Sequence, residues 1–133
     1  MNFPILAVDP GRDKCGLAVV DESGAILARR VVPAAAMETE LLQLAREWKI
    51  KRIVLGDSTS SRRWQQRMEQ WLPEIALTVV DETHSTLEAR VLYWQANPPR
   101  GWRRFVPLSL QTPPEPLDDF AAVVLARRWL SCA

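Results

Sequence analysis

The chain has 133 residues, of which 47% are hydrophobic and 25% are charged, and its formal net charge is +1. These values are typical of a soluble globular protein, and the length suits a single domain spanning residues 1–133. No apolar run approaches the roughly 20 residues of a membrane span, and Cys15 and Cys132 lack a metal-type or redox-type spacing, which excludes a membrane protein and a disulfide framework.

The first residues form a strand-like segment and lack the features of a secretory signal. This predicts a cytoplasmic protein. Ile5 to Val8 and Cys15 to Val20 are apolar runs joined by the turn Asp9-Pro10-Gly11. Ser23-Gly24 is a second tight turn, and a third run follows from Ala25 to Val32. Apolar runs separated by such turns predict an antiparallel meander of three strands.

Helices and strands alternate after the meander. Apolar spacing, a capping-box pattern and proline positions predict helices over residues 36–49, 61–72, 85–95 and 117–130. Short apolar runs predict buried strands at 53–55 and 75–80, and another short strand at 104–106. We therefore expect an α/β domain with a five-stranded mixed sheet, antiparallel in its first three strands and parallel in its later part.

Acidic residues end two of the expected strands. Asp9 directly follows the first strand, and Glu82 comes shortly after the strand over 75–80. Ligands of such sheets bind outside the carboxyl ends of the parallel strands. If the two strands are neighbours, the two carboxylates converge at one edge of the sheet.

A third acid, Asp118, opens the last helix. It shares a helical stripe with Ala121, Ala122, Leu125 and Trp129. An acid on a stripe of small apolar residues should face the sheet, and the small side chains would let the helix approach closely.

Each acid also has a simpler interpretation. Asp9 is a common residue before a Pro-Gly turn, Asp118 is favourable near a helix start, and Glu82 could be a charged strand end. Two close carboxylates repel each other and call for a positive counter-charge, which a divalent metal such as Mg²⁺ supplies. The coincidence of three acids favours a two-metal site for phosphodiester hydrolysis.

Arginine and aromatic residues gather in two segments, a combination that suits phosphates and unstacked bases. One segment, residues 89–114, has no acidic residue, and the other holds Arg62, Arg63, Trp64 and Arg67. A solvated charged face with anchoring tryptophans is the alternative interpretation. The residues that we assign to nucleic-acid binding are Arg90, Arg100, Trp102, Arg103 and Arg104.

The tryptophans divide into two groups. Trp48, Trp71 and Trp129 lie on apolar stripes and are expected in the core. Trp94 and Trp102 could instead cover a dimer surface, which makes a homodimer one of the expected assemblies.

Three motifs resemble those of one family. Ile5-Leu-Ala-Val-Asp-Pro-Gly11 with Cys15-Gly-Leu-Ala-Val19 resembles the first motif of the YqgF/RuvX family, Holliday junction resolvase-like proteins of the RNase H-like superfamily. Asp81-Glu-Thr-His-Ser-Thr-Leu-Glu-Ala-Arg90 resembles its second motif, and Leu117-Asp-Asp-Phe-Ala-Ala-Val-Val-Leu125 resembles its closing helix. The motifs occur in the family order and cover nearly the whole chain.

The resemblance implies an RNase H-like fold and a metal-dependent nuclease acting on structured nucleic acid, either precursor 16S ribosomal RNA or Holliday junction-like DNA. It also implies that Asp9, Glu82 and Asp118 are the catalytic acids and hold Mg²⁺ or Mn²⁺. Our hypothesis is a two-metal phosphodiesterase in which Asp9 would bridge both ions. Asp118 is preferred to Asp119 because the paired alanines begin three residues after it, as in the family pattern.

The chain departs from the family pattern at several phosphate-facing positions. Thr83 stands where the family has arginine, residues 56–60 replace a Gly-Leu-Pro loop, and residues 111–116 replace a lysine-rich segment. These departures support an alternative, a catalytically silent nucleic-acid-binding or scaffold domain. An ATP-binding fragment of the actin-like class is disfavoured because a second enclosing domain is lacking. His84 could lie beside the scissile phosphate or at the surface where the helix begins.

Overall fold

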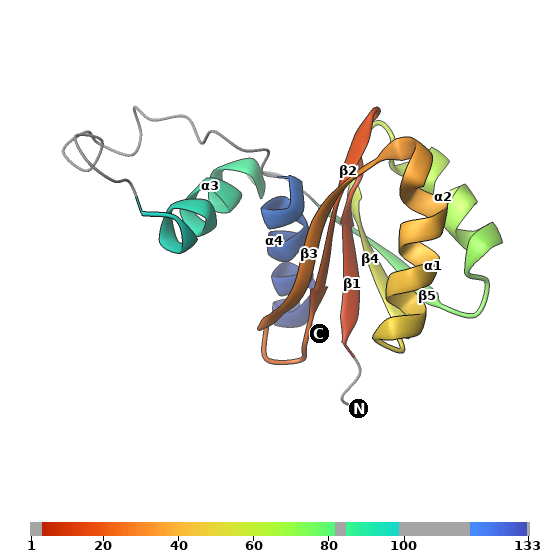
Figure 1. Ribbon diagram of the computed structural model, residues 1–133, viewed down its shortest axis with the longest axis horizontal. Coiled ribbons are helices and arrows are strands. Elements are labelled where there is room, and N and C mark those ends of the chain that lie inside the picture. The colour runs from red at the N-terminus through yellow and green to blue at the C-terminus, as the bar shows by residue number, and fades with distance from the viewer. Residues whose placement is uncertain (1–3, 82–84, 99–117, 133) are drawn as a thin grey trace.

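The computed structural model describes residues 4–81, 85–98 and 118–132 (Figure 1). In chain order its elements are β1 (Ile5–Asp9), β2 (Lys14–Val20), β3 (Ile26–Pro33), η1 (Ala34–Ala36), α1 (Met37–Glu47), β4 (Arg52–Asp57), α2 (Ser61–Trp71), β5 (Ala76–Asp81), α3 (Ser85–Ala96) and α4 (Asp118–Cys132). None of the helices in these ranges is long and apolar enough to cross a membrane.

The strands form a single five-stranded sheet in the order β3-β2-β1-β4-β5. β1, β2 and β3 pair antiparallel, whereas β4 is parallel to both β1 and β5. This is the predicted mixed sheet. The predicted strand at 104–106 lies outside the described residues.

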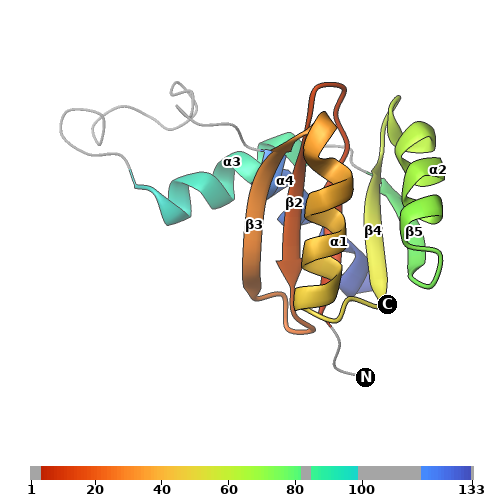
Figure 2. The ribbon, with the colours of Figure 1, turned by 45° about the vertical axis from the view of Figure 1, so that its right-hand side comes forward.

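The sheet separates two layers of helices, and Figures 1 and 2 show α1 and α2 on one face and α4 on the other. Side chains alternate between faces along a strand. In β1, Leu6 and Val8 therefore join the core under α1 and α2, whereas Ile5 and Ala7 join the core under α4. α3 packs on α4, where Tyr93 and Phe120 belong to a third cluster.

The prediction of a buried strand at 75–80 is wrong, because β5 lies at an edge of the sheet and its residues are half-buried or exposed. The condition set for Asp9 and Glu82, that their two strands are neighbours, is not met, because β4 lies between β1 and β5. Their carboxyl ends still point to the same edge, since both strands are parallel to β4.

The prediction for the tryptophans is confirmed in part, since Trp48, Trp71 and Trp129 all pack against the core. Trp48, Trp71 and Trp129 are only partly buried, whereas Trp64 is 2% and Trp94 is 9% exposed. Trp48 follows the last residue of α1 and Trp71 is the last residue of α2, so both lie where a helix leaves the core. Trp94 packs against its own chain, with its ring 5.0 Å from that of Tyr93.

Candidate active site

Asp9 ends β1 on the face that α4 covers. The alternation that directs Ile5 and Ala7 toward α4 continues to Asp9, two residues further on. Asp9 is half-buried, and its register partner across the antiparallel pair is Gly16 of β2. The carboxylate therefore lies at the carboxyl edge of the sheet, next to a strand position that has no side chain.

Gly16 is the place where α4 touches the sheet. A Cβ atom on Gly16 would lie 1.8 Å from the backbone oxygen of Asp118 and 2.7 Å from the backbone nitrogen of Asp119. Only glycine allows this approach, because any other residue would collide with the helix backbone. Since Gly16 pairs with Asp9, the backbone of Asp118 packs on the strand position beside Asp9.

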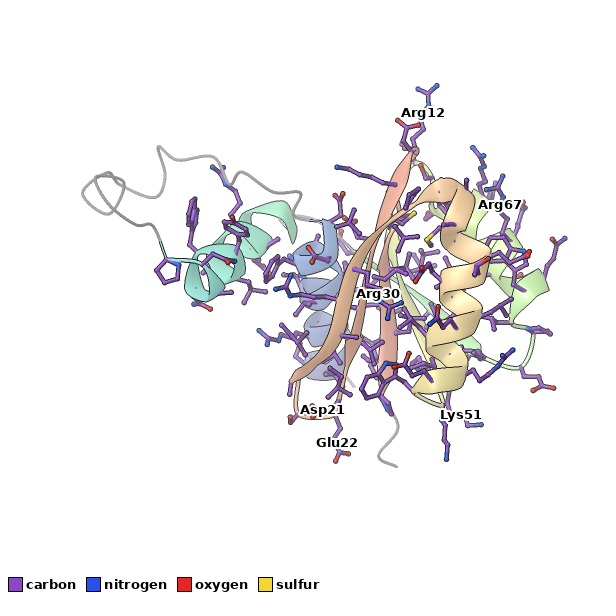
Figure 3. The ribbon with its side chains drawn as sticks, viewed as in Figure 1. Arg12, Asp21, Glu22, Arg30, Lys51 and Arg67 are labelled. Atoms are coloured by element: carbon purple, nitrogen blue, oxygen red, sulfur yellow. The ribbon has the colours of Figure 1, made fainter. Side chains whose placement is uncertain are left out.

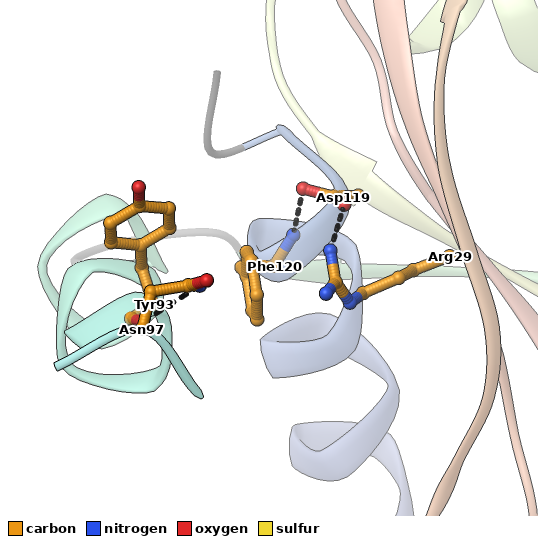
Figure 4. A network of polar contacts seen from close by, with 5 residues as sticks. All are labelled: Arg29, Tyr93, Asn97, Asp119 and Phe120. Atoms are coloured by element: carbon orange, nitrogen blue, oxygen red, sulfur yellow. Dashed lines mark hydrogen bonds and ion pairs between the residues drawn. The ribbon is translucent and has the colours of Figure 1, made fainter. Parts of the chain in front are cut away.

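A partly buried ion pair holds the first turn of α4 in place (Figure 4). Oδ2 of Asp119 accepts a hydrogen bond of 2.8 Å from Arg29 of β3, and Oδ1 accepts one of 2.9 Å from the Phe120 backbone N–H. The Arg29 guanidinium also lies 4.2 Å from the centre of the Phe120 ring. These contacts join the edge strand β3 to the helix start and so restrict where Asp118 can lie.

The Asp118 carboxylate is incompletely satisfied. Its Oδ2 atom is buried and has no hydrogen-bond partner among the described residues, and Lys14 Nζ lies 3.5 Å away. The Lys14 side chain is 52% exposed, so much of its charge is screened by water.

The pKa of the Cys15 thiol is affected by both carboxylates. Burial is the main cause that raises the pKa of the Cys15 thiol; a backbone hydrogen bond with Gly11 lowers it, and the negative charges of Asp9 and Asp118 raise it further. The negative charges of two carboxylates from opposite ends of the chain thus both raise the pKa of one thiol.

The third predicted acid, Glu82, lies outside the described residues. The preceding residue, Asp81, ends β5, and its backbone oxygen accepts a hydrogen bond of 2.9 Å from Arg128. Arg128 lies about 15 Å along α4 from Asp118 at the helical rise. Within residues 4–81, 85–98 and 118–132, no three or more metal-ligating side chains come together. The described residues therefore place two of the three acids, Asp9 and Asp118, at the same edge of the sheet.

The predicted nucleic-acid-binding residues are mostly not described. Arg100, Trp102, Arg103 and Arg104 lie outside the described residues, whereas Arg90 is half-buried in α3.

Trp64, which the sequence grouped with arginines as a base-stacking candidate, is a core residue. It is 2% exposed, and its Nε1 donates a hydrogen bond of 3.0 Å to the Gly11 backbone oxygen. Trp64 therefore fits the alternative interpretation of this segment, an anchoring tryptophan within a charged face, because its ring has no free face toward solvent.

Three important residues were not identified from the sequence as part of the site. Gly16 interrupts a strand pattern, which is a known signal for a close backbone approach, and it could have been recognised. Arg29 and Asp119 carried no such signal, because their pairing joins residues that are 90 positions apart.

The comparisons with known proteins agree with this architecture. The sequence profile of the family described as the Tex protein YqgF-like domain matches residues 3–89. A search against curated protein sequences gives no significant match.

Two solved structures share the fold over nearly the whole chain. The Fowlpox virus resolvase, solved with its substrate Holliday junction DNA, covers 98% of this chain and is itself covered to 98%, with a TM-score of 0.64 and 13% identity. Thermus thermophilus RuvC covers 93% of this chain and is covered to 90%, with a TM-score of 0.57 and 11% identity. The fold is RNase H-like, as predicted.

A third match is partial. A ROK family glucokinase from Streptomyces griseus has a TM-score of 0.45 and 15% identity, and covers 65% of this chain. The chain spans 36% of the length of that protein.

Proposed function

The chain belongs to the Tex protein YqgF-like domain family, and from this premise we propose that it is a metal-dependent nuclease that hydrolyses phosphodiester bonds in structured nucleic acid. The observation that supports the proposal is the packing of the Asp118 backbone on Gly16, the register partner of Asp9, at the carboxyl edge of the sheet. Two carboxylates near this edge repel each other unless a positive charge compensates them, and a divalent cation would supply that charge.

The residues present fit a hard divalent cation. Mg²⁺ and Mn²⁺ prefer carboxylate oxygens, and the buried Asp118 Oδ2 lacks a hydrogen-bond donor among the described residues. In our proposal Asp9 and Asp118 hold the metal. Bound metal would supply an activated water and stabilise the leaving oxygen. The chain's own contribution is to fix the two carboxylates, Asp118 through the Gly16 contact and the Arg29–Asp119 pair.

Glu82 is proposed as the third acid. It follows Asp81 at the end of β5, and the register places the end of β5 beside the end of β4. The family motif that Asp81 opens supports this role, and β5 ends at the same edge of the sheet as β1.

Branched DNA and structured RNA are the substrate classes to test. The Fowlpox virus resolvase is a protein of the same fold whose substrate is Holliday junction DNA, and family resemblance supports precursor 16S ribosomal RNA. Incubating the purified chain with labelled four-way junction DNA and with precursor RNA, in Mg²⁺ or Mn²⁺, would identify the class.

The decisive variants are Asp9→Asn and Asp118→Asn, which keep side-chain size but remove the charge. Each should lower the cleavage rate by at least about 100-fold, equivalent to about 2.7 kcal/mol of transition-state stabilisation. Asp57→Asn is the matched control, because Asp57 also ends a strand at this edge but contacts Ser61 of α2, with 3.5 Å between Oδ1 and Oγ. Cleavage that survives Asp9→Asn would overturn the assignment.

The position of Lys14 supports an alternative function, that of a catalytically silent nucleic-acid-binding domain. Its ammonium group lies 3.5 Å from Asp118 Oδ2 and already supplies a positive charge there. A catalytically silent nucleic-acid-binding domain would need no metal at this position. Titration calorimetry separates the two functions, because a silent domain should bind nucleic acid with the same affinity with and without Mg²⁺.

A further inference from the structure

We infer that α2 and the β1–β2 turn form a binding surface for the phosphate backbone of nucleic acid, beside the acidic site and separate from the arginines of residues 89–114. This α2 basic surface consists of Arg12, Arg62, Arg63 and Arg67. The identity of the partner rests on the proposed function, whereas the surface itself rests on the observations below.

The charges of α2 are reversed with respect to helix stability. α1 has Glu38 and Glu40 in its first turn and Arg46 in its last, which complements the helix dipole. α2 has no acid in its first turn and no base in its last, and Arg62 and Arg63 occupy its positive end. Because this arrangement disfavours the isolated helix, stability does not account for the two arginines, and an anionic partner does.

The guanidinium groups of this surface are not used in ion pairs within the described parts of the chain. There, ion pairs join Arg29 to Asp119, Arg30 to Glu40 and Arg128 to Glu88, but none involves a residue of the α2 basic surface.

The two acids that flank the arginines of α2 have neutral hydrogen-bond partners. Asp57 Oδ1 lies 3.5 Å from Ser61 Oγ, and Glu69 accepts a bond of 3.4 Å from Gln65. Arg12, Arg62 and Arg63 are exposed, so their charges face solvent rather than the core.

Trp64 joins α2 to the turn that carries Asp9. Its Nε1 donates to the Gly11 oxygen at 3.0 Å, one residue before Arg12, and the Arg67 guanidinium lies 5.1 Å from the centre of its ring. The buried ring therefore serves as a rigid link between the two parts of the surface. Figure 3 shows Arg12 and Arg67 toward the same end of the molecule, opposite Asp21 and Glu22.

Arginine on a helix next to an acidic cleavage site is suited to phosphates rather than to a protein partner. Its planar fork matches phosphate oxygens, and Arg63 and Arg67, four residues apart, lie on the same side of the helix. A strand bound in this way would run along α2 to the β1–β2 turn and would reach the carboxylates on the α4 face by crossing the carboxyl edge of the sheet.

The test is binding without cleavage. Anisotropy of a fluorescent four-way DNA junction and of a fluorescent RNA strand is measured with the whole chain in EDTA, across a series of salt concentrations. Arg62→Glu with Arg63→Glu should weaken binding by at least about tenfold and lower the salt slope by about 2, one for each lost phosphate contact. The matched control, Arg46→Glu with Lys51→Glu, has the same charge change on another part of the surface and should change the slope by less than about 1.

Several results would overturn the inference. They are equal weakening by both double variants, no weakening by the α2 variant, or an equal α2-dependent affinity for polyglutamate, which would indicate an acidic protein partner. If the α2 double variant has a lowered Tm, Arg62→Gln with Arg63→Gln is used, and it should still lower the slope.

Binding and cleavage separate this inference from the proposed function. Mg²⁺-dependent cleavage that is unaffected by the α2 variant overturns only the surface. Binding that depends on Arg62 and Arg63 in a protein that cleaves neither substrate overturns only the nuclease.

Discussion

The two faces of the sheet are packed in different ways. The face under α1 and α2 is filled with large side chains, among them Leu6, Leu17, Leu41 and Trp64, all at most 2% exposed. The face under α4 is filled mainly with alanine and valine, and at Gly16 the helix backbone itself touches the sheet.

This difference shows why the two acids meet on the α4 face. Large side chains hold a helix away from a sheet, whereas small ones let the backbones approach. Asp118 is at the start of α4 and reaches Asp9 because the helix lies so close. One face therefore supplies core volume, and the other supplies the geometry of the site.

The largest effect is expected from filling the close contact. Gly16→Val should destabilise the fold by at least about 4 kcal/mol, beyond the usual 1–3 kcal/mol of overpacking, because the new Cβ collides with backbone rather than with a movable side chain. Denaturant unfolding measures this loss, and Ala25→Val in the exposed β2–β3 turn is the control. An unchanged unfolding midpoint would contradict the contact.

On the opposite face the damaging change is removal of volume. Leu41→Ala in α1 should cost about 2–4 kcal/mol through the cavity it leaves. The acids lie on the other face, so the folded fraction should retain its Mg²⁺-dependent cleavage. Unfolding and cleavage measured at the same low temperature check both statements, and a loss of cleavage in folded protein would show that the faces are coupled.

Arg29 and Arg30, adjacent residues of β3, allow the two faces of the sheet to be compared directly, because each pairs with a helix on a different face. Arg29 faces α4 and pairs with Asp119, whose side chain is 10% exposed, whereas Arg30 pairs with the more exposed Glu40 of α1. Arg29→Met should cost about 1–3 kcal/mol by leaving a buried carboxylate unpaired, and Arg30→Met less than about 1 kcal/mol. Only Arg29→Met should also raise the Mg²⁺ concentration needed for half-maximal cleavage, since only that pair positions Asp118.

The smallest effect concerns alkaline stability. The pKa of Cys15 is raised in the folded protein, mainly by burial, so its protonated form stabilises the fold below the ordinary thiol pKa of about 8.5. This contribution is lost as the pH rises from the ordinary thiol pKa to the folded-state pKa. Over this pH range the free energy of unfolding should therefore fall in the parent protein, and fall less in Cys15→Ala. Parallel curves for the two proteins would contradict the burial of an uncharged thiol.

Local pattern was sufficient for most of the fold. Hydrophobic spacing and turn residues predicted the meander, the later strands and helices, and the mixed sheet, because these patterns act between residues near in sequence. The stripe of Ala121, Ala122 and Leu125 also predicted a close approach of the last helix, and all three residues are buried. The single-domain organisation and the joint role of Asp9, Glu82 and Asp118 stay predictions.

Long-range packing determined the rest. The edge position of β5, the burial of Trp64 and the pairing of Arg29 with Asp119 depend on which distant segments come together. No local periodicity encodes such contacts, because their energy comes from burial and charge pairing that exist only once the layers have assembled. For the same reason, a glycine in a strand became the position at which two acids from opposite ends of the chain meet.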